Sequence, residues 1–270
     1  MKRCIFLFLF LILVNNIING QFKAVRIPDD MLAKMKIVGD TADWNWVSKK
    51  YLITEQSMYK VVSADNNNWN CWIKVGWSDL NHKLYIIAKV TDNIFITNNS
   101  EYYFNDCMQF AINPDNGGGL FGSENNRAKH TIKGYFVYVS DKSTDLIVDV
   151  GPDWLKGHEK EYISWNVQHY DKKEGGGYER IYEMCLNLWD IWENRGAEYS
   201  SPTELYPLKR IRLALIFNDS DILQSTSFNE WTNLAGNTWW RDASVIPEFV
   251  LDIPFKNGIS WQAIRYVLGQ

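Results

Sequence analysis

Leu84-Tyr85-Ile86-Ile87-Ala88-Lys89-Val90 is a run whose apolar side chains recur at every second position, starting from Leu84. Because successive side chains of a β-strand point to opposite faces, this period of two predicts a strand that buries one face. The run from Cys107 to Ile112 has the same period. Its two faces carry, respectively, Met108, Phe110 and Ile112, and then Cys107, Gln109 and Ala111. Both runs indicate a chain built from β-strands.

The rest of the chain continues this pattern in short apolar runs, separated by clusters of Asn, Asp, Gly and Ser. Further strands are predicted at 135–139, 146–150, 163–167, 181–188, 211–217 and 249–253. Helical patterns are scarce and are limited to 29–35 and 190–195. Many strands and few short helices predict an all-β fold, an antiparallel β-sandwich of the jelly-roll or immunoglobulin-like kind.

The N-terminus has the features of a secretory signal peptide. Met1-Lys2-Arg3 is positively charged, residues 4–14 are apolar, and a polar stretch follows up to Gly20. This apolar run is too short for a transmembrane helix, and no later run is long enough. We therefore expect cleavage near Gly20, which leaves 1–20 as signal peptide. Residues 21–270 are then a single monomeric domain, released to the extracellular space or the periplasm.

Charge and cysteine content exclude some classes of partner and site. Without Lys2 and Arg3, the mature chain has 26 basic and 32 acidic side chains, a net charge of −6. This acidic balance, with no basic stripe, argues against nucleic acid as a partner. Cys71, Cys107 and Cys185 are widely spaced within strand-like runs, which favours buried thiols over metal ligands and leaves one disulfide possible.

Tryptophan is unusually abundant, with 13 in 270 residues, and several lie among polar neighbours. The clearest case is Asn237-Thr238-Trp239-Trp240-Arg241-Asp242. Two adjacent indoles in polar surroundings indicate that at least one ring faces solvent, as a flat apolar platform bordered by hydrogen-bonding groups. Such a surface suits a sugar. The alternative for any single Trp is ordinary burial in the core.

A second candidate surface precedes the strand at 107–112. Tyr102, Tyr103 and Phe104 form an aromatic loop, and Gln109 is predicted to face away from the core, on the outer surface shared with that loop. A ring covers the C–H face of a pyranose while an amide pairs with its hydroxyls. The alternative is that these rings only cap the sandwich.

Several segments in order resemble the motifs of family 9 carbohydrate-binding modules, which are β-sandwich modules attached to secreted xylanases. The segments are 37–44 (IVGDTADW), 73–79 with 84–86 (IKVGWSD and LYI), 106–110 (DCMQF), 176–178 (GGY), 217–219 (FND) and 237–244 (NTWWRDAS). They correspond to the family patterns I-x-G-x-x-x-D-W, V-x-W-D-x-x-x-L-Y-V, D-S-V-E-I, G-G-Y, V-N-D and N-x-x-W-R-D-P-S. The resemblance covers residues 37–253.

The resemblance implies a sugar clamped between two aromatic rings, here Tyr103 and Trp240. It also implies polar contacts from Asn237 and Gln109, with Lys133 at a position where the family has a basic residue. Arg241 either holds a hydroxyl or pairs with Asp242 to support Trp240. Tyr103 replaces the family's Trp. Gln109 replaces Glu, which removes a charge-assisted hydrogen bond roughly twice as strong as a neutral one.

The resemblance also implies structural calcium, which family members bind. Asp40, Asp43 and Asp92 are the candidate ligands, because each is an acidic residue at an expected loop position. Ordinary turn and surface roles are the alternative for each.

No catalytic motif stands out. The chain has neither a Ser nucleophile elbow nor an HExxH zinc motif, and carboxylate pairs are uninformative among 32 acidic residues. We therefore expect a secreted, non-catalytic protein that binds mono-, oligo- or polysaccharide, linked to polysaccharide recognition or degradation. The alternatives are a protein-interaction or adhesion module, a glycan-acting hydrolase and, more distantly, a haem-binding module.

Overall fold

The computed structural model describes residues 22–62, 69–97, 101–120, 131–140, 143–172, 176–222, 229–232 and 241–252. The expected signal peptide at 1–20 lies outside these residues, as do Asn237, Trp239 and Trp240. Within the described ranges, no helix has the length and apolar character needed to cross a membrane.

The protein is mostly β and contains one large sheet of 13 strands, in the order β8-β7-β6-β13-β15-β1-β4-β5-β10-β9, with β14, β2 and β3 attached off this path. The strands are β1 (Phe22–Arg26), β2 (Ile53–Thr54), β3 (Tyr59–Val62), β4 (Asn70–Trp77), β5 (Leu84–Asp92), β6 (Cys107–Asn113), β7 (Ile132–Ser140), β8 (Ser143–Val150), β9 (Ile163–Asp171), β10 (Tyr178–Leu186), β13 (Arg210–Asp219), β14 (Asn229–Thr232) and β15 (Glu248–Asp252). A separate hairpin pairs β11 (Trp189–Ile191) with β12 (Ser201–Pro202).

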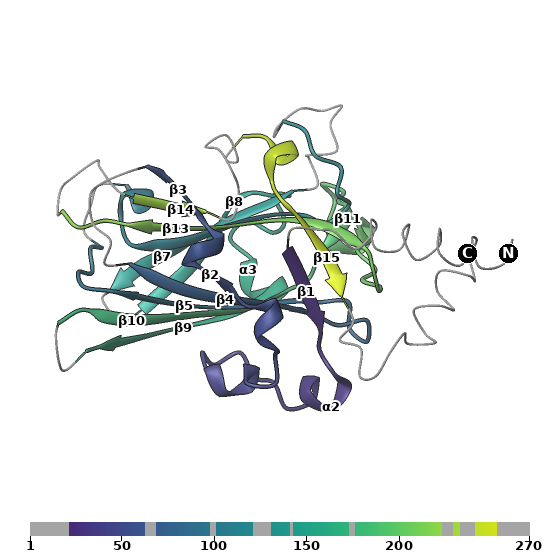
Figure 1. Ribbon diagram of the computed structural model, residues 1–270. Coiled ribbons are helices and arrows are strands. Elements are labelled where there is room, and N and C mark those ends of the chain that lie inside the picture. The colour runs from purple at the N-terminus through teal and green to yellow at the C-terminus, as the bar shows by residue number, and fades with distance from the viewer. Residues whose placement is uncertain are drawn as a thin grey trace, which may run out of the picture.

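The sheet doubles back on itself, so that β7, β13 and β14 lie over β4, β5, β10 and β9 (Figure 1). The main core fills the space between these two halves. Phe136 and Phe217 from one half meet Tyr182 from the other, with ring centroids 5.4 and 6.4 Å apart. All the strands predicted from the sequence are present, and the all-β class is confirmed.

The expected all-antiparallel arrangement is wrong at one place. β1 pairs parallel with both β15 and β4, and so joins the two halves. No prediction covered Phe22–Arg26, because a run of five residues is too short for a period to stand out.

The two helical predictions had different outcomes. α2 (Asp29–Leu32) confirms the first, and α3 (Glu159–Tyr162) is the other short α-helix in the described residues. The short turn expected at 190–195 begins instead as a strand, because Trp189 packs into the core and β11 pairs there with β12, and a turn follows at 194–195.

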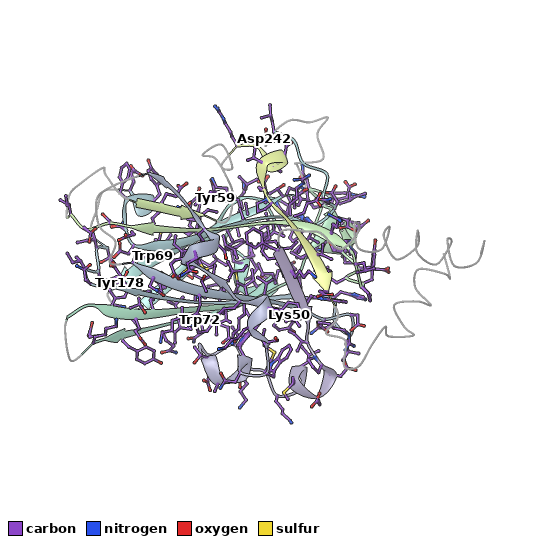
Figure 2. All side chains as sticks on the ribbon, in the orientation of Figure 1. Lys50, Tyr59, Trp69, Trp72, Tyr178 and Asp242 are labelled. Carbon is purple, nitrogen blue, oxygen red and sulfur yellow. The ribbon has the colours of Figure 1, made fainter. Side chains whose placement is uncertain are left out.

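The segment that follows β1 covers the outer face of the β4-β5-β10 half. It contains short 3₁₀ helices at Thr41–Trp44 and Lys49–Tyr51, and its Trp44 is fully buried. Lys50 and Trp72 lie on this side of the molecule, whereas Asp242 lies on the opposite side (Figure 2). The protein therefore has one outer face under the N-terminal segment and another under the 241–248 segment.

Candidate functional site

The candidate site lies on the outer face of the β13-β6-β7-β8 half. In the register, Gln109 of β6 stands between Ile216 of β13 and Tyr135 of β7. Gln109 faces away from Phe110 and the main core, as its strand position predicts. The expectation that it lies on an exposed surface is wrong, however, because only 3% of it is accessible. Gln109 is therefore a buried amide at the base of this face.

Small side chains on this face make room for the segment that leads from the NTWWRDAS motif into β15. Ala111 and Ala214 are paired across β6 and β13, and they pack with Ile216, Ala243 and Ile246 in a small apolar cluster. The segment makes a turn of 3₁₀ helix at Ala243–Val245, capped by Asp242, whose carboxylate accepts from the Ser244 amide at 2.8 Å. The second half of the motif is thus fixed over the face that carries Gln109.

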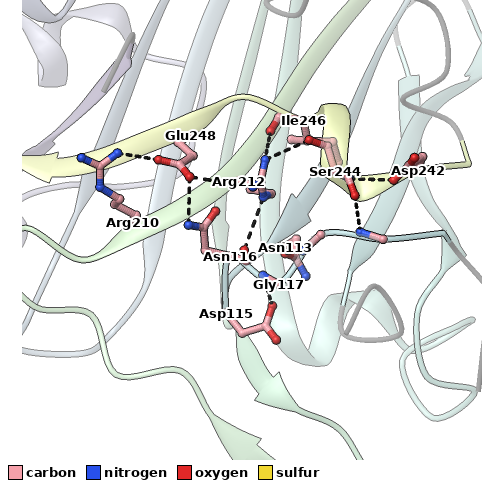
Figure 3. Close-up of polar contacts among 12 residues, drawn as sticks. Asn113, Asp115, Asn116, Gly117, Arg210, Arg212, Asp242, Ser244, Ile246 and Glu248 are labelled. Carbon is pink, nitrogen blue, oxygen red and sulfur yellow. Dashed lines mark hydrogen bonds and ion pairs between the residues drawn. The ribbon is translucent and has the colours of Figure 1, made fainter. Parts of the chain in front are cut away.

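Arg212 of β13 fastens this segment to the loop after β6 (Figure 3). Its guanidinium donates to the carbonyl oxygens of Ser244 at 3.1 Å, Ile246 at 2.8 Å and Asn116 at 3.4 Å. Ser244 Oγ also accepts from the Gly119 amide at 2.7 Å. A planar guanidinium suits this role because its donors have fixed directions.

Glu248, at the start of β15, continues this polar network. Its carboxylate accepts from Asn116 Nδ2 at 3.1 Å and pairs with Arg210. These two hydrogen bonds hold the pKa of Glu248 below its ordinary value. Both ends of the segment from Asp242 to Glu248 are therefore tied to neighbouring elements.

Tyr103 lies at one end of the same face. It belongs to the 3₁₀ helix at Tyr102–Phe104, is 36% exposed, and packs edge-on against Phe104 with centroids 4.5 Å apart. Its carbonyl oxygen accepts from Asn218 Nδ2 at 2.5 Å. Asn218 is paired with Cys107 at the end of β13, on the face that also carries Gln109. This hydrogen bond holds the backbone of Tyr103 next to Asn218, on the face that carries Gln109.

Lys133 of β7 is on this face too, and it does not stand alone. Its ammonium group lies 3.0 Å from Asp149 Oδ2, which also accepts from the Tyr135 hydroxyl at 3.2 Å. Lys133 is buried, whereas the Asp149 side chain is 44% exposed. Tyr135 and Asp149 are not among the site residues predicted from the sequence. The alternation of Lys133 and Tyr135 along one strand was the available signal.

The structure thus brings Tyr103, Gln109 and Lys133 to one face and adds Asn218, Tyr135 and Asp149. Arg241 is exposed and directly precedes the docked turn. Asn237 and Trp240 lie outside the described residues. Cys71, Cys107 and Cys185 are free and buried, as expected.

The three residues expected to hold calcium have separate locations. Asp40 caps the first 3₁₀ helix by accepting from the Ala42 amide at 2.8 Å, and Asp43 accepts from the Lys36 amide at 3.4 Å. Asp92, at the end of β5, instead lies with Asp219 and Asp221, with one carboxylate oxygen from each within 4.8 Å of the others. Sequence reasoning missed Asp219 and Asp221, although Asp219 lies in the quoted FND motif.

Asp92 is only 2% exposed, and among the described residues its Oδ2 has no hydrogen-bond partner. Burial, and then the charge of Asp219, raises its pKa to about 7. Carboxylates held this close need a proton or a cation between them. Three oxygen donors, one of them buried and unsatisfied, fit a hard cation such as calcium.

Comparison with solved structures shows the fold. No protein-family model matches the chain, and neither does any curated protein. A family 9 carbohydrate-binding module from Caldicellulosiruptor kristjanssonii in complex with cellotriose is 15% identical, covers 88% of this chain and 97% of its own, and gives a TM-score of 0.59. A structure of such a module from the same organism in complex with glucose is 13% identical, covers 88% and 98%, and gives 0.53. Over 88% of its length, the chain therefore has the fold of family 9 carbohydrate-binding modules.

Proposed function

We propose that this protein is a secreted, non-catalytic β-sandwich that binds carbohydrate at the face carrying Tyr103, Gln109 and Lys133. The observation that supports this most strongly is that the buried amide of Gln109 and the buried ammonium group of Lys133 share one face with Asn218, which holds the backbone of the exposed Tyr103. The similar modules, by their titles, hold cellotriose and glucose. The proposed ligand is a mono-, oligo- or polysaccharide, and the protein is proposed to bind it as a monomer.

Each group on the face has a role in this proposal. Tyr103 covers one side of a sugar ring, and Trp240 covers the other. Gln109 and Lys133 reach hydroxyls from the base of the face, and Arg241 does so from the start of the 241–248 segment that Arg212 fastens. Asn237 is a further proposed contact to a hydroxyl. Each neutral hydrogen bond adds about 0.5–1.5 kcal/mol, and those from charged groups add about 1.5–3 kcal/mol.

Asp149 extends the proposed contact set. One of its oxygens is engaged by Lys133 and Tyr135, and its side chain is 44% exposed at the edge of the face. A carboxylate has about four lone-pair sites, so Asp149 can still accept from a sugar hydroxyl. Its contact with Lys133 also fixes the direction of the ammonium group.

Structural calcium is part of the proposal. Of the three expected ligands, we retain Asp92 and join it to Asp219 and Asp221 instead of Asp40 and Asp43, since those two already serve backbone amides in local turns. Bound there, the ion supplies charge neutralisation between the ends of β5 and β13. It has no part in any chemical step.

The test is a titration of the mature protein with glucose, cellotriose and a broader sugar panel, followed by tryptophan emission. Tyr103→Ala is expected to weaken binding about tenfold or more through loss of apolar ring burial, and Trp240→Ala to abolish it with little loss of stability. Tyr170→Ala is the matched control, since Tyr170 is 50% exposed on the edge strand β9.

The same samples separate the alternatives. Release of reducing ends would identify a glycan-acting hydrolase, and absence of any saturable shift across the panel would favour a protein-interaction module. Intact sugar with saturable binding supports the proposed function. Unfolding of Trp240→Ala would place that ring in the core and remove it from the clamp.

A further inference from the structure

Asn218 and Asp219 end β13 and Ser220 follows the strand; each of the three residues contacts a different neighbour. The Asn218 amide holds the Tyr103 carbonyl at 2.5 Å. The Asp219 carboxylate points to the other side of the strand and joins Asp92 and Asp221. The Ser220 amide donates to Asp106 Oδ1 at 2.6 Å. The acidic cluster and the Tyr103 loop therefore share three consecutive residues.

Asp106 anchors the loop that carries Tyr103. Besides the Ser220 amide, it accepts from the Ile96 amide at 2.8 Å and from the Tyr178 hydroxyl at 3.3 Å, and its own amide donates back to Ile96 at 2.9 Å. Ile96 lies four residues after Asp92 on the segment that leaves β5. The ends of β5 and β13 thus determine together where the loop from Glu101 to Asp106 sits.

The acidic cluster has a property that points to a ligand. Asp92 and Asp219 are 2% and 1% exposed, and Asp92 Oδ2 is buried with no hydrogen-bond partner among the residues that the structure describes. Water cannot solvate these charges, so their repulsion acts directly on the ends of the two strands. A cation bound between the carboxylates replaces their mutual repulsion with attraction and so holds the two strand ends together.

We propose that a divalent cation bound by Asp92, Asp219 and Asp221 increases the affinity of the sugar site, because it fixes Asn218 and Asp106 and thereby the position of Tyr103. This inference rests on the proposed sugar-binding function and states that calcium regulates it. The ligands are all carboxylate oxygens, which favours calcium over softer metals such as zinc. By linkage, sugar must raise the affinity for calcium by the same factor.

The experiment measures calcium and sugar separately, at one fixed pH, on chelator-treated mature protein. Calorimetric titration with CaCl₂ is expected to show a site that Asp221→Asn weakens about tenfold or more. Asp153→Asn is the matched control, because Asp153 is 91% exposed and lies outside the cluster. It is expected to leave calcium binding unchanged. Absence of calcium binding in the wild type would overturn the proposal.

The coupling has two readouts. Cellotriose affinity is expected to be about fivefold or more higher with calcium than with chelator, and hydrogen exchange at amides 103–106 is expected to slow when calcium binds. Asn218→Ala is expected to bind calcium and yet to lose part of both effects, since it cuts the direct link to Tyr103 and leaves the contacts of Asp106 with Ser220 and Ile96 in place. Calcium binding without either effect in the wild type would overturn the coupling and leave sugar binding standing.

Hydrogen exchange needs no sugar. If cellotriose fails to bind with or without calcium, the proposed function fails, and the exchange at 103–106 still decides whether the cation positions the loop.

Discussion

The indole Nε1 of Trp44 donates a 2.9 Å hydrogen bond to Oε1 of Glu183, a carboxylate that is completely buried. Oε2 of the same group accepts from the amides of Val38 at 3.0 Å and Gly39 at 2.8 Å. One side chain of β10 thus holds the N-terminal segment on its half of the sheet. The IVGDTADW motif at 37–44 therefore has a structural role, on the side of the protein opposite the candidate site.

Glu183→Gln is expected to destabilise the protein by about 1–3 kcal/mol, because the new amide turns a donor toward donors and leaves at least one unsatisfied. Urea denaturation of the two proteins checks this. Glu179→Gln, on the same strand with a partly exposed side chain, is the control and is expected to cost less than about 1 kcal/mol. Equal stability of wild type and Glu183→Gln would contradict the anchoring role.

The pH dependence of this anchor has a defined sign. Burial raises the pKa of Glu183 above its ordinary value of 4.5, despite three hydrogen bonds that lower it. The folded state then binds a proton more tightly than the unfolded state. The stability of wild type relative to Glu183→Gln is therefore expected to fall as pH rises from about 4.5 through the raised pKa. Denaturation curves across this range measure the difference, and a rise with pH would refute the assignment.

Phe110→Ala is expected to cost about 3–5 kcal/mol, enough to unfold a marginal domain, because Phe110 is fully buried in the main core opposite Gln109. Ile147→Ala provides the control from the neighbouring outer face, since Ile147 is 46% exposed. Thermal unfolding followed by circular dichroism compares them. A Phe110→Ala protein as stable as Ile147→Ala would mean that the two faces of β6 are assigned the wrong way round.

Arg212→Lys is expected to lower the affinity for sugar while the protein still folds. A lysine ammonium cannot reach the carbonyls of Asn116, Ser244 and Ile246 together. The hydrogen bonds that are lost stabilise the position of the 241–248 segment by about 1–3 kcal/mol. Arg26→Lys is the matched control, because Arg26 pairs with Asp29 and Asp79 near the N-terminal segment. Cellotriose titrations of both variants test this, and an equal effect of the two would argue against the fastening.

Lys133→Met is expected to lower sugar affinity about tenfold or more, because a charge-assisted hydrogen bond to a hydroxyl is lost while the buried stem is kept. Asp149→Asn should lower it less, since the amide keeps one acceptor toward Lys133. Asp145→Asn is the control, because Asp145 lies on β8 with Asp149 and its side chain is 52% exposed. Unchanged affinity in Lys133→Met would exclude Lys133 from the site.

The sequence alone predicts the strands well, because a period of two marks a sheet with one buried face. Tyr103, Gln109 and Lys133, which the sequence and its resemblance name as sugar contacts, lie on or beside one face, and their contact with sugar stays a prediction. It does not predict that Gln109 is buried, since burial depends on how Ala111 and Ala214 let a distant segment dock above them. Nor does it pair Asp92 with Asp219, because the ends of β5 and β13 meet only after the sheet doubles back.

The most direct test of sugar binding at this face is a crystal structure of the protein grown with cellotriose. We expect a sugar ring stacked on Tyr103, with hydroxyls within hydrogen-bond distance of Gln109 and Lys133. Density for the sugar on any other surface, or none at this face when solution binding is saturable, would contradict it.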